Sequence, residues 1–371
     1  MALGLIVVYS SSFALGVQAF NDANYFVIRQ AMWAGIGIAL LLALMRIDYR
    51  WLRSVSPLFM LGAIVLLMAV LVPGLGIEQQ GAHRWIALGP LPPLQPSEFA
   101  KLALIIYVSA WLAGKGTYLQ TWAMGFVPFV TMVGIVAGLT LLEPDTGTAA
   151  VLVLTTVTLF FVAGASVTHL AALGGIGGVA SGLLLLTAGY RTDRLLAFLD
   201  PNSDPSGVGF HTLQLLIALG SGGVSGLGLG DSRQKFFYIY GSHTDGVFAI
   251  IGEELGLIGA LAVLLLFAVL IYRGFRVVLN ARDEFGALLA TGIVCWIAYQ
   301  ALINVGGVTR AIPMTGIPMP FLSYGGSALA ALLAAVGILL SISRTAEEPR
   351  PAEREKEPRR RTRAAGRRGA R

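Results

Sequence analysis

One stretch decides the fold: HTDGVFAIIGEELGLIGALAVLLLFAVLIY, which runs from His243 to Tyr272. Its charged residues lie in the first half, and no charged side chain occurs between Leu257 and Tyr272. A helix needs about 20 consecutive apolar residues to cross the hydrocarbon core of a bilayer. The stretch is long enough for that, so the sequence predicts a membrane-spanning helix with carboxylates near one of its ends.

The composition extends this prediction to the whole chain of 371 residues. Hydrophobic residues make up 56% and charged residues only 12%, whereas an average soluble protein has about 25% charged residues. A soluble globular protein is therefore excluded. Apolar windows predict an all-α integral membrane protein with about ten transmembrane helices, at Ala2 to Ala19, Tyr25 to Met45, Val55 to Val72, Ser97 to Leu112, Trp122 to Leu142, Thr148 to Ala165, His169 to Ala188, Asp245 to Tyr272, Phe285 to Val305 and Ser327 to Ile342.

The basic residues predict the direction of these helices. Alternate loops carry Arg46, Arg50, Arg53, Lys115, Arg273, Arg276 and Arg282. The positive-inside rule assigns these loops and both chain termini to the cytoplasm. The first span could instead be a cleaved signal peptide, because Val17-Gln18-Ala19 resembles a signal-peptidase site. Cleavage would leave an odd number of helices and break the alternation, so we expect the span to be retained.

The end of the chain differs from the rest. The formal net charge is +6, and residues 345–371 hold ten basic and five acidic residues, which contribute +5. This tail has no aromatic or large aliphatic residue, so it should be disordered, cytoplasmic, and either solvated or in contact with anionic lipid. Residues 1–344 form the polytopic membrane domain. No nucleic-acid partner is expected without aromatic residues for stacking, and the lone Cys295 excludes disulfides.

Three predicted outward segments are longer than a connection needs: Pro73 to Pro96, residues 189–244, and Gly306 to Gly326. The second is a large extracytoplasmic loop between the seventh and eighth helices. It contains an apolar run, HTLQLLIALG (His211 to Gly220), and then a glycine-rich run that ends at Asp231. Long loops of this kind usually serve a function. The glycines match a dinucleotide fingerprint only weakly, because no strand precedes them, so we expect them to permit tight packing.

Ionisable residues at the edges of spans are functional candidates. Glu98 and Lys101 are three residues apart and share a helix face, so they can form a structural pair or hold an anionic ligand. In the turn Glu143-Pro144-Asp145-Thr146-Gly147, Asp145 has the position of a helix N-cap. Capping is favoured over direct chemistry for that residue.

Asp245 is the candidate for chemistry. It lies where the large loop re-enters the membrane, wet on one side and apolar on the other, where the pKa of a carboxylate can rise toward that of a general base. Capping of the following helix is the structural alternative. Glu253 and Glu254 lie about 12 Å deeper along a helix. His243 has no second His or Cys at ligand spacing, so it predicts no metal site.

Basic residues also occur on the side predicted to face outward, where the positive-inside rule leaves few. They are Arg84, Arg191, Arg194, Arg233, Lys235 and Arg310. Each alone is explained as a solvated surface group. Together around one interfacial acid they predict a site for a phosphate-bearing substrate, because guanidinium groups bind phosphate oxygens in pairs.

Several motifs, in the expected order, resemble the SEDS family (shape, elongation, division and sporulation), which includes FtsW, RodA and SpoVE. They are HRWIALG with QPSEFAKLALIIY (His83 to Tyr107), EPDTGTA (Glu143 to Ala149), RLLAFLDP (Arg194 to Pro201), QLLIALGSGG with GLG (Gln214 to Gly228), HTDGVFAIIGEELGL (His243 to Leu257) and MTGIPMPFLSYGGS (Met314 to Ser327). The resemblance covers Leu5 to Arg344 and implies a SEDS-type fold. The ending GILLSISR (Gly337 to Arg344) is closer to FtsW than to RodA.

The resemblance implies a peptidoglycan glycosyltransferase of the bacterial cytoplasmic membrane. Such an enzyme polymerises lipid II into glycan strands for septal or lateral wall synthesis and releases undecaprenyl pyrophosphate. Asp245 would be catalytic, accepting the proton of the acceptor hydroxyl as that oxygen attacks the anomeric carbon. The candidate substrate-binding residues are Arg84, Glu98, Lys101, Asp145, Arg191, Arg194, Lys235, His243 and Ser323.

The resemblance also implies partners: a class B penicillin-binding protein, which is a transpeptidase, and other membrane proteins of the divisome or elongasome. No resident cofactor is expected, although a divalent cation, Mg²⁺ or Mn²⁺, could assist the leaving diphosphate. The sequence departs from the family pattern of Leu-Pro-Glu before His-Thr-Asp-Phe, since Ile239-Tyr240-Gly241 occupy that place and Gly246 follows Asp245.

Two alternative functions stay open. A lipid II flippase would also need charges near the midplane, and the deeper Glu253 and Glu254 keep that possibility. A non-enzymatic scaffold for division proteins explains the tail and the loops, but it leaves Asp245 without a purpose.

Overall fold

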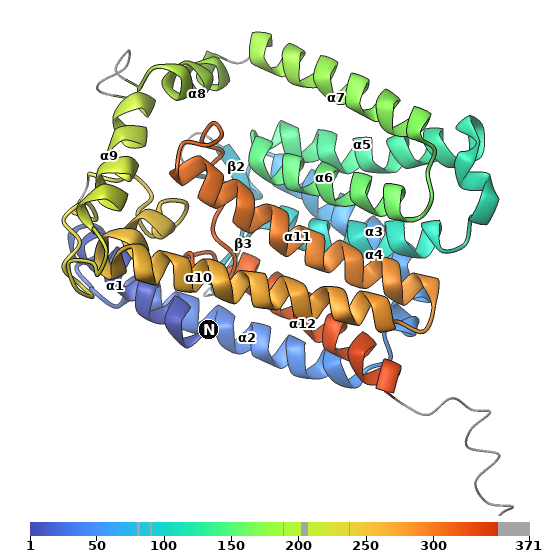
Figure 1. The fold of residues 1–371 in the computed structure, drawn as a ribbon, viewed down its shortest axis with the longest axis horizontal. Coiled ribbons are helices and arrows are strands. Elements are labelled where there is room, and N and C mark those ends of the chain that lie inside the picture. Colours follow the sequence, from blue (N-terminus) through green and yellow to red (C-terminus); the bar gives the residue numbers. More distant parts are fainter. Residues whose placement is uncertain (80–81, 90, 188, 202–206, 237, 348–371) are drawn as a thin grey trace, which may run out of the picture.

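The computed structural model describes residues 1–79, 82–89, 91–187, 189–201, 207–236 and 238–347, and most of them are helical (Figure 1). The long helices are α1 (Ala2–Phe20), α2 (Tyr25–Arg46), α3 (Arg50–Leu71), α4 (Pro96–Leu112), α5 (Val127–Leu142), α6 (Thr146–Val162), α7 (Val167–Thr187), α10 (Val247–Asn280), α11 (Glu284–Val308) and α12 (Gly326–Glu347). Shorter ones are the 3-10 helix η1 (Gly116–Gln120), the π-helix η2 (Trp122–Phe126), α8 (Gly189–Leu199) and α9 (Val208–Ser221).

Eight of the described helices are long and apolar enough to cross a membrane. They are α1, α2, α3, η2 with α5, α7, α10, α11 and α12. The other two predicted spans coincide with α4 and α6, which have 17 residues each. Every predicted span therefore corresponds to a helix, while the total of ten crossings stays a prediction.

The two ends of the helix bundle differ. A small sheet lies at one end together with α8 and α9, and we call this the sheet end; α12 finishes at the opposite end, the tail end (Figure 1). At the tail end the Tyr49 hydroxyl donates to Asp283 Oδ2, and Asp283 Oδ1 caps α11 through the Gly286 amide at 2.8 Å. Burial, and then the bond to Asp283, raise the pKa of Tyr49 to about 12.

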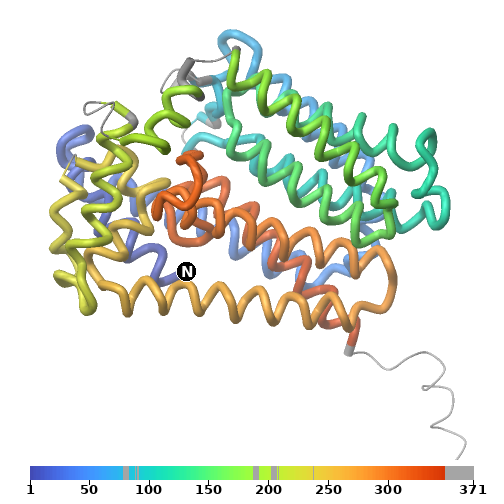
Figure 2. The backbone as a smooth tube through the Cα atoms, turned by 45° about the horizontal axis from the view of Figure 1, so that its top comes forward, coloured from blue at the N-terminus to red at the C-terminus, as the bar shows by residue number. Residues whose placement is uncertain are grey.

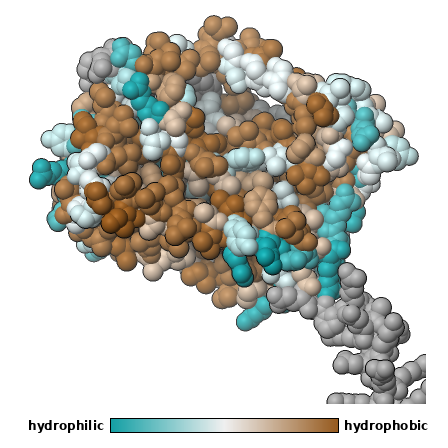
Figure 3. Space-filling model, viewed as in Figure 1, coloured by the Kyte–Doolittle hydropathy of each residue, from teal (hydrophilic) through white to brown (hydrophobic). Residues whose placement is uncertain are grey.

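The core and the rim of the bundle are separate. In α11 and α12, 72% and 78% of the spanning residues are buried, whereas the value is 6% for α7. α7 runs beside the rest of the bundle in both ribbon and tube views (Figures 1 and 2). The space-filling view shows a largely apolar face that is hollowed beneath α7 (Figure 3). An apolar surface of this extent fits contact with lipid.

The sheet is the main feature that the sequence analysis did not predict. It consists of β1 (Gly76–Gln79), β2 (Ala82–Leu88) and β3 (Leu91–Leu94), paired antiparallel in that order. β3 reads LPPL, and prolines argue against a strand except at the edge of a sheet. β3 is such an edge strand, so the segment from Pro73 to Pro96 is not the irregular loop that an all-helical chain would have.

The segment predicted as a large loop contains α8 and α9 and then packs its glycines against α10. α10 is broken at Gly256, which has φ 67° and ψ −167°. Non-helical backbone at membrane depth needs hydrogen-bond partners from the protein. The glycine-rich segment supplies them, with Leu227 and Gly228 amides donating to Glu253 and Glu254 carbonyls at 3.0 Å each, and Leu257 and Ile258 amides donating to Gly223 and Val224 carbonyls at 2.9 and 3.2 Å.

Glycine is required at these contacts. A side chain at Gly222 would collide with the Gly252 carbonyl, and one at Gly226 with the Glu254 carbonyl. The prediction that these glycines permit tight packing is therefore confirmed.

Candidate active site

Asp245 lies in a tight turn at the sheet end, just before α10. The amides of Thr244 and Gly246 both donate to the Gly241 carbonyl, at 2.9 and 3.1 Å. Gly241 has φ 72°, and a side chain there would collide with Asp245 Oδ1. The absence of a side chain at Gly241 therefore leaves room for the carboxylate of Asp245.

The Asp245 side chain does not cap α10. The N-cap residue of that helix is Gly246, and no side chain caps it. Asp245 Oδ1 instead accepts a hydrogen bond from the Thr244 hydroxyl at 3.0 Å, and the residue is half-buried. The capping alternative is wrong for Asp245, because the carboxylate turns back toward its own loop.

Two other segments hold this turn by its backbone. Asn304 Nδ2, on α11, donates to the Asp245 carbonyl at 2.9 Å and to the Ile317 carbonyl at 2.7 Å. The Ser323 hydroxyl donates to the Thr244 carbonyl, and the Tyr324 amide donates to the His243 carbonyl at 2.7 Å. Ser323 is buried and also accepts a hydrogen bond from the Met319 amide. Its hydroxyl therefore holds the backbone of this loop together.

Gln30 extends this support to α2. Its Nε2 donates to the Ser323 carbonyl and its Oε1 accepts from the Gly325 amide, both at 3.2 Å. Gln30 and Asn304 were missed by the sequence analysis. Both residues place an amide side chain inside an apolar span. A polar group is costly in lipid, so such a residue predicts a hydrogen-bond partner within the protein.

Arg194 and two histidines surround the turn. A side-chain carbon at Gly316 would lie 3.7 Å from Asp245 Oδ2 and 3.9 Å from both terminal nitrogens of Arg194, which puts these two groups on one side of Gly316. His211 lies one helical turn before Leu215, whose side chain packs toward Gly246, so it shares that face of α9.

Both imidazoles favour the neutral form. Burial lowers the pKa of His211, which the Asp245 carboxylate opposes, and burial lowers the pKa of His243 to about 4. His243 packs on Phe26 and Tyr324, with ring centroids 4.8 and 5.6 Å away. A neutral imidazole can accept one hydrogen bond and donate another near Asp245 without adding a positive charge there.

Arg84 binds the turn from Glu143 to Gly147, which also lies at the sheet end. Its guanidinium, on β2, donates to the carbonyls of Glu143 and Pro144. Asp145 caps α6 through the Thr148 amide at 2.9 Å and accepts from the Thr148 hydroxyl at 2.8 Å, so the capping interpretation is confirmed. A side chain at Gly147 would meet Ile317 and the Thr315 carbonyl, which places this turn next to the loop that borders Asp245.

Glu143 is buried in that turn, and neither carboxylate oxygen has a hydrogen-bond partner among the described residues. Burial, and then the Asp145 carboxylate, raise the pKa of Glu143 to about 8, although the nearby Arg84 opposes this. Glu143 is therefore largely protonated at neutral pH, an outcome that its place in the motif did not reveal.

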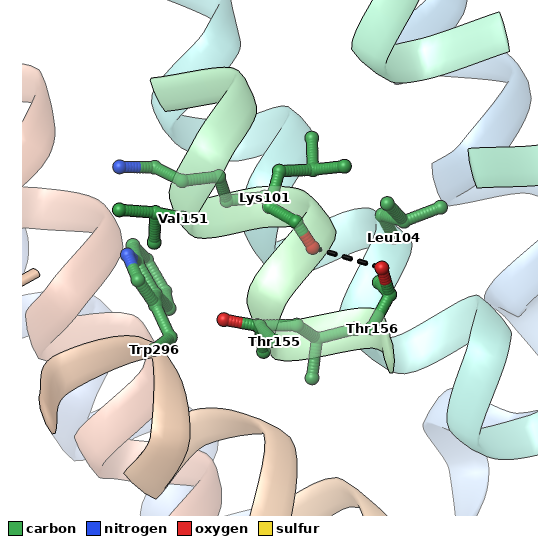
Figure 4. A pocket seen from close by; sticks show the side chains of 8 residues that line it. Lys101, Leu104, Val151, Thr155, Thr156 and Trp296 are labelled. Carbon is green, nitrogen blue, oxygen red and sulfur yellow. Dashed lines mark hydrogen bonds between the residues drawn. The ribbon is translucent and has the colours of Figure 1, made fainter. Parts of the chain in front are cut away.

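Glu98 and Lys101 form a buried ion pair at 2.9 Å. Lys101 also donates to Gln300 Oε1 at 3.2 Å, and Gln300 Nε2 donates to the Pro318 carbonyl at 3.1 Å. Beside Lys101 is a gap, also lined by Val151, Thr155 and Trp296, that is too narrow for a water molecule (Figure 4). Through Gln300, the pair is therefore linked to the backbone of the 317–319 segment.

Lys235 is also paired inside the protein. Its ammonium group donates to Glu254 Oε1 at 2.9 Å, and Ser10 of α1 donates to the same carboxylate at 2.6 Å. Glu253 accepts from the Ser232 hydroxyl and from the Arg233 amide, the latter at 2.9 Å. The two deep acids that kept the flippase alternative open therefore fix the glycine-rich loop to α10.

The remaining predicted cations have different environments. Arg310 donates to the carbonyls of Phe198 and Leu199, and Arg194 donates to the Met314 carbonyl at 3.3 Å. Arg233 is exposed, and the Arg191 side chain lies outside the described residues. Across the described part of the chain, no three His, Cys, Asp or Glu residues are grouped to hold a metal ion.

The chain matches the model of a known protein family. The family model described as "Cell cycle protein" (FtsW/RodA/SpoVE) matches residues 1–348. The chain belongs to the FtsW/RodA/SpoVE family. With this membership and eight span-length helices among its described residues, it is a multi-pass membrane protein.

Curated relatives share most of their length with this member of the FtsW/RodA/SpoVE family. Stage V sporulation protein E of Bacillus subtilis is 45% identical over 344 residues, which cover 93% of this chain and 94% of that protein. A probable peptidoglycan glycosyltransferase FtsW of Trichlorobacter lovleyi is 42% identical over 346 residues, which cover 92% and 90%. These identities confirm membership of the family. They do not decide between an FtsW and a SpoVE role, because both names occur among the similar relatives.

Solved structures agree with the fold. A chain from a peptidoglycan synthase complex, described as coordinating polymerization and crosslinking, superposes with a TM-score of 0.75 and 27% identity, covering 93% of this chain and 97% of that one. The rod shape determining protein RodA of Thermus thermophilus gives a TM-score of 0.66 at 28% identity, covering 94% and 97%.

Proposed function

We propose that the protein is a peptidoglycan glycosyltransferase that polymerises lipid II, with Asp245 as the general base. One observation carries the proposal: a half-buried carboxylate is held by its backbone at the sheet end, and among the described residues only the Thr244 hydroxyl donates to it. Its Oδ2 accepts no hydrogen bond from the described residues, so it is available for a substrate hydroxyl. Relatives named peptidoglycan glycosyltransferase support the same activity.

The reaction needs one proton acceptor. Asp245 Oδ2 takes the proton of the acceptor sugar hydroxyl while that oxygen bonds to the anomeric carbon of the donor, and the bond to the diphosphate breaks. The diphosphate leaves with its negative charge, which nearby cations stabilise. Arg194, on the same side of Gly316 as Asp245, is placed for that role. A divalent cation, if used, would arrive with the diphosphate.

This function requires one orientation in the membrane. The sheet end would face outward, toward the growing wall, and the tail end would face the cytoplasm, as the basic loops indicate. The membrane would be the bacterial cytoplasmic membrane. An impermeant thiol reagent that labelled a cysteine introduced after Arg344 in intact cells would contradict this orientation.

The decisive variant is Asp245→Asn. It keeps the volume and the backbone contacts but removes the base, so lipid II polymerisation should fall by at least about a hundredfold. Asp231→Asn, in the same outer segment but exposed, is the matched control and should polymerise like the wild type. Glycan products are separated by gel electrophoresis after incubation with purified lipid II. A folded Asp245→Asn protein within a fewfold of the wild-type rate would reject Asp245 as the base.

A transpeptidase is the proposed partner. The similar synthase complex supports a class B penicillin-binding protein, because polymerase and crosslinking activities gain from being held together. At the sheet end Leu75 is 55% exposed, and apolar residues in such a place mark contact surfaces. Binding can raise turnover only by favouring the active state. Equal polymerisation with and without the co-expressed transpeptidase, and no co-purification, would argue against this partner.

A further inference from the structure

Most cations at the sheet end already have partners inside the protein. Arg84 and Arg310 bind backbone carbonyls, Lys101 and Lys235 are paired with buried glutamates, and Arg194 donates to the Met314 carbonyl. A diphosphate leaving group carries several negative charges and needs donors that are not already used. Arg194 lies beside Asp245 but already donates to a carbonyl, so a group with several negative charges needs a further cation whose donors are unused.

Arg29 has this property. It lies in the second turn of α2, and its guanidinium carbon is 4.2 Å from the centre of the Tyr25 ring. Among the described residues, no carboxylate pairs with Arg29 and no carbonyl accepts a hydrogen bond from it. The Tyr25 ring, which stacks on Phe20 at 3.6 Å, supports one face of the guanidinium and leaves its N–H donors unused. An arginine within a span is expensive in lipid and therefore a functional candidate.

Arg29 also borders the candidate active site. Phe26, three residues earlier, contacts His243 and Tyr324 with ring centroids at 4.8 and 5.1 Å. Burial raises the pKa of Tyr324 to about 12, and the positive charge of Arg29 opposes that rise. Gln30, the next residue, holds the 323–325 turn that supports Asp245. The first turns of α2 thus form a wall beside the catalytic turn.

We propose that Arg29 binds a phosphate group of the lipid-linked diphosphate, in the substrate and in the departing polyprenyl diphosphate. This inference rests on the proposed function. A planar guanidinium backed by an aromatic ring, at the membrane boundary and beside the base, matches a diphosphate whose lipid tail remains in the bilayer. An ordinary phospholipid headgroup has the same phosphate chemistry and is the other source to be distinguished.

Direct binding tests the proposal without requiring turnover. Wild type, Arg29→Gln, Arg29→Lys and Arg53→Gln are purified into phosphatidylcholine nanodiscs, and each is titrated with undecaprenyl diphosphate and with undecaprenol. Arg53→Gln removes one positive charge at the tail end and is the matched control. Arg29→Gln should weaken diphosphate binding about tenfold or more and leave undecaprenol binding unchanged. Arg29→Lys should lie between, because it keeps the charge and loses the fork.

The outcomes distinguish a lipid-linked diphosphate from a phospholipid headgroup as the ligand of Arg29. They also distinguish failure of the Arg29 inference from failure of the proposed polymerase function. Equal diphosphate affinity in wild type and in folded Arg29→Gln or Arg29→Lys protein would overturn the inference. So would a loss that disappears when the nanodiscs contain phosphatidylglycerol, because Arg29 would then be an ordinary lipid contact. A wild type that binds diphosphate but never polymerises lipid II would reject the proposed function instead. A wild type that polymerises, with Arg29→Gln unchanged in binding, would reject this inference alone.

Discussion

The side-chain amide of Asn304 lies 2.9 Å from the carbonyl oxygen of Asp245 and donates a hydrogen bond to it. The same nitrogen donates to the Ile317 carbonyl at 2.7 Å. One buried amide on α11 therefore joins the turn that bears Asp245 to the loop that contains Ile317. Because the bond goes to the backbone of Asp245, the turn is positioned without using the carboxylate oxygens.

Replacing Asn304 should affect the rate more than substrate binding. Asn304→Leu removes both donors, so the turn that bears Asp245 loses its fixed position, and we expect kcat to fall by about tenfold or more with KM within a fewfold. Lipid II polymerisation by detergent-purified protein measures both constants. Asn304→Gln, which keeps an amide on a longer side chain, should retain part of the rate. A Leu variant with normal kcat would show that Asn304 has only a structural role.

Gln30 should act through the same turn from the other side. Gln30→Leu leaves the Gly325 amide without its acceptor and the Ser323 carbonyl without its donor, at a cost of about 1–3 kcal/mol in stability. Polymerisation should fall while diphosphate binding at Arg29 is kept. Thr131→Val, at an exposed position of α5, serves as the matched polar-to-apolar control. Thermal unfolding and polymerisation are measured together, and a Gln30→Leu protein as active as Thr131→Val would contradict the prediction.

Glu143 should make stability depend on pH. Its folded pKa of about 8 lies above its ordinary value of 4.5, so folding favours the protonated form. The stability due to this group is fully present below about pH 4.5 and is lost as the pH rises to about 8. Glu143→Gln, which is neutral at all pH values, should therefore gain Tm relative to wild type by several degrees between pH 5 and 8. A constant difference in Tm across that range would show that Glu143 is ionised in the folded protein.

The break in α10 should depend on glycine at position 256. Gly256→Ala would force an L-residue into a positive-φ conformation and into the backbone of Gly226, which should cost at least about 2 kcal/mol. Gly62→Ala, inside α3 with open space around it, is the control and should be neutral or slightly stabilising. Thermal unfolding in detergent compares the two. Equal Tm values would mean that the backbone at residue 256 can relax.

The buried pair of Lys235 and Glu254 should show strong coupling. Lys235→Met alone leaves a buried carboxylate without its cation and should destabilise the protein by about 3–5 kcal/mol. Adding Glu254→Gln should recover much of that loss, because no uncompensated charge remains. A double-mutant cycle by thermal or denaturant unfolding measures the coupling. Additive effects of the two substitutions would indicate that the pair does not interact in the membrane.

The helices were predictable because the bilayer sets a minimum length for each apolar run. The capping by Asp145 and the pairing of Glu98 with Lys101 were also predictable, since both depend on residues three apart. The contacts that position Asp245 were not, because Gln30 and Ser323 are 293 residues apart in the chain. No local pattern encodes such a contact. A run of prolines likewise concealed the edge strand β3.

The cations that were predicted to face outward show a further limit of sequence reasoning. Their charge and spacing predicted a phosphate site, yet Arg84 and Arg310 direct their guanidinium groups to backbone carbonyls. A guanidinium binds either kind of oxygen, and the sequence does not record which oxygen lies within reach. Only the folded chain separates cations that fasten loops from cations that remain available.

The break at Gly256 has a consequence for how the protein is made. The segment that completes the hydrogen bonds of α10 precedes it in the chain, so residues 222–228 have left the ribosome before α10 begins to enter the membrane. Without this segment, the amides of Leu257 and Ile258 would be unpaired in lipid, which costs several kcal/mol for each group. The glycine-rich segment is thus already available to pair with these amides when α10 enters the membrane, whether or not it also meets a substrate.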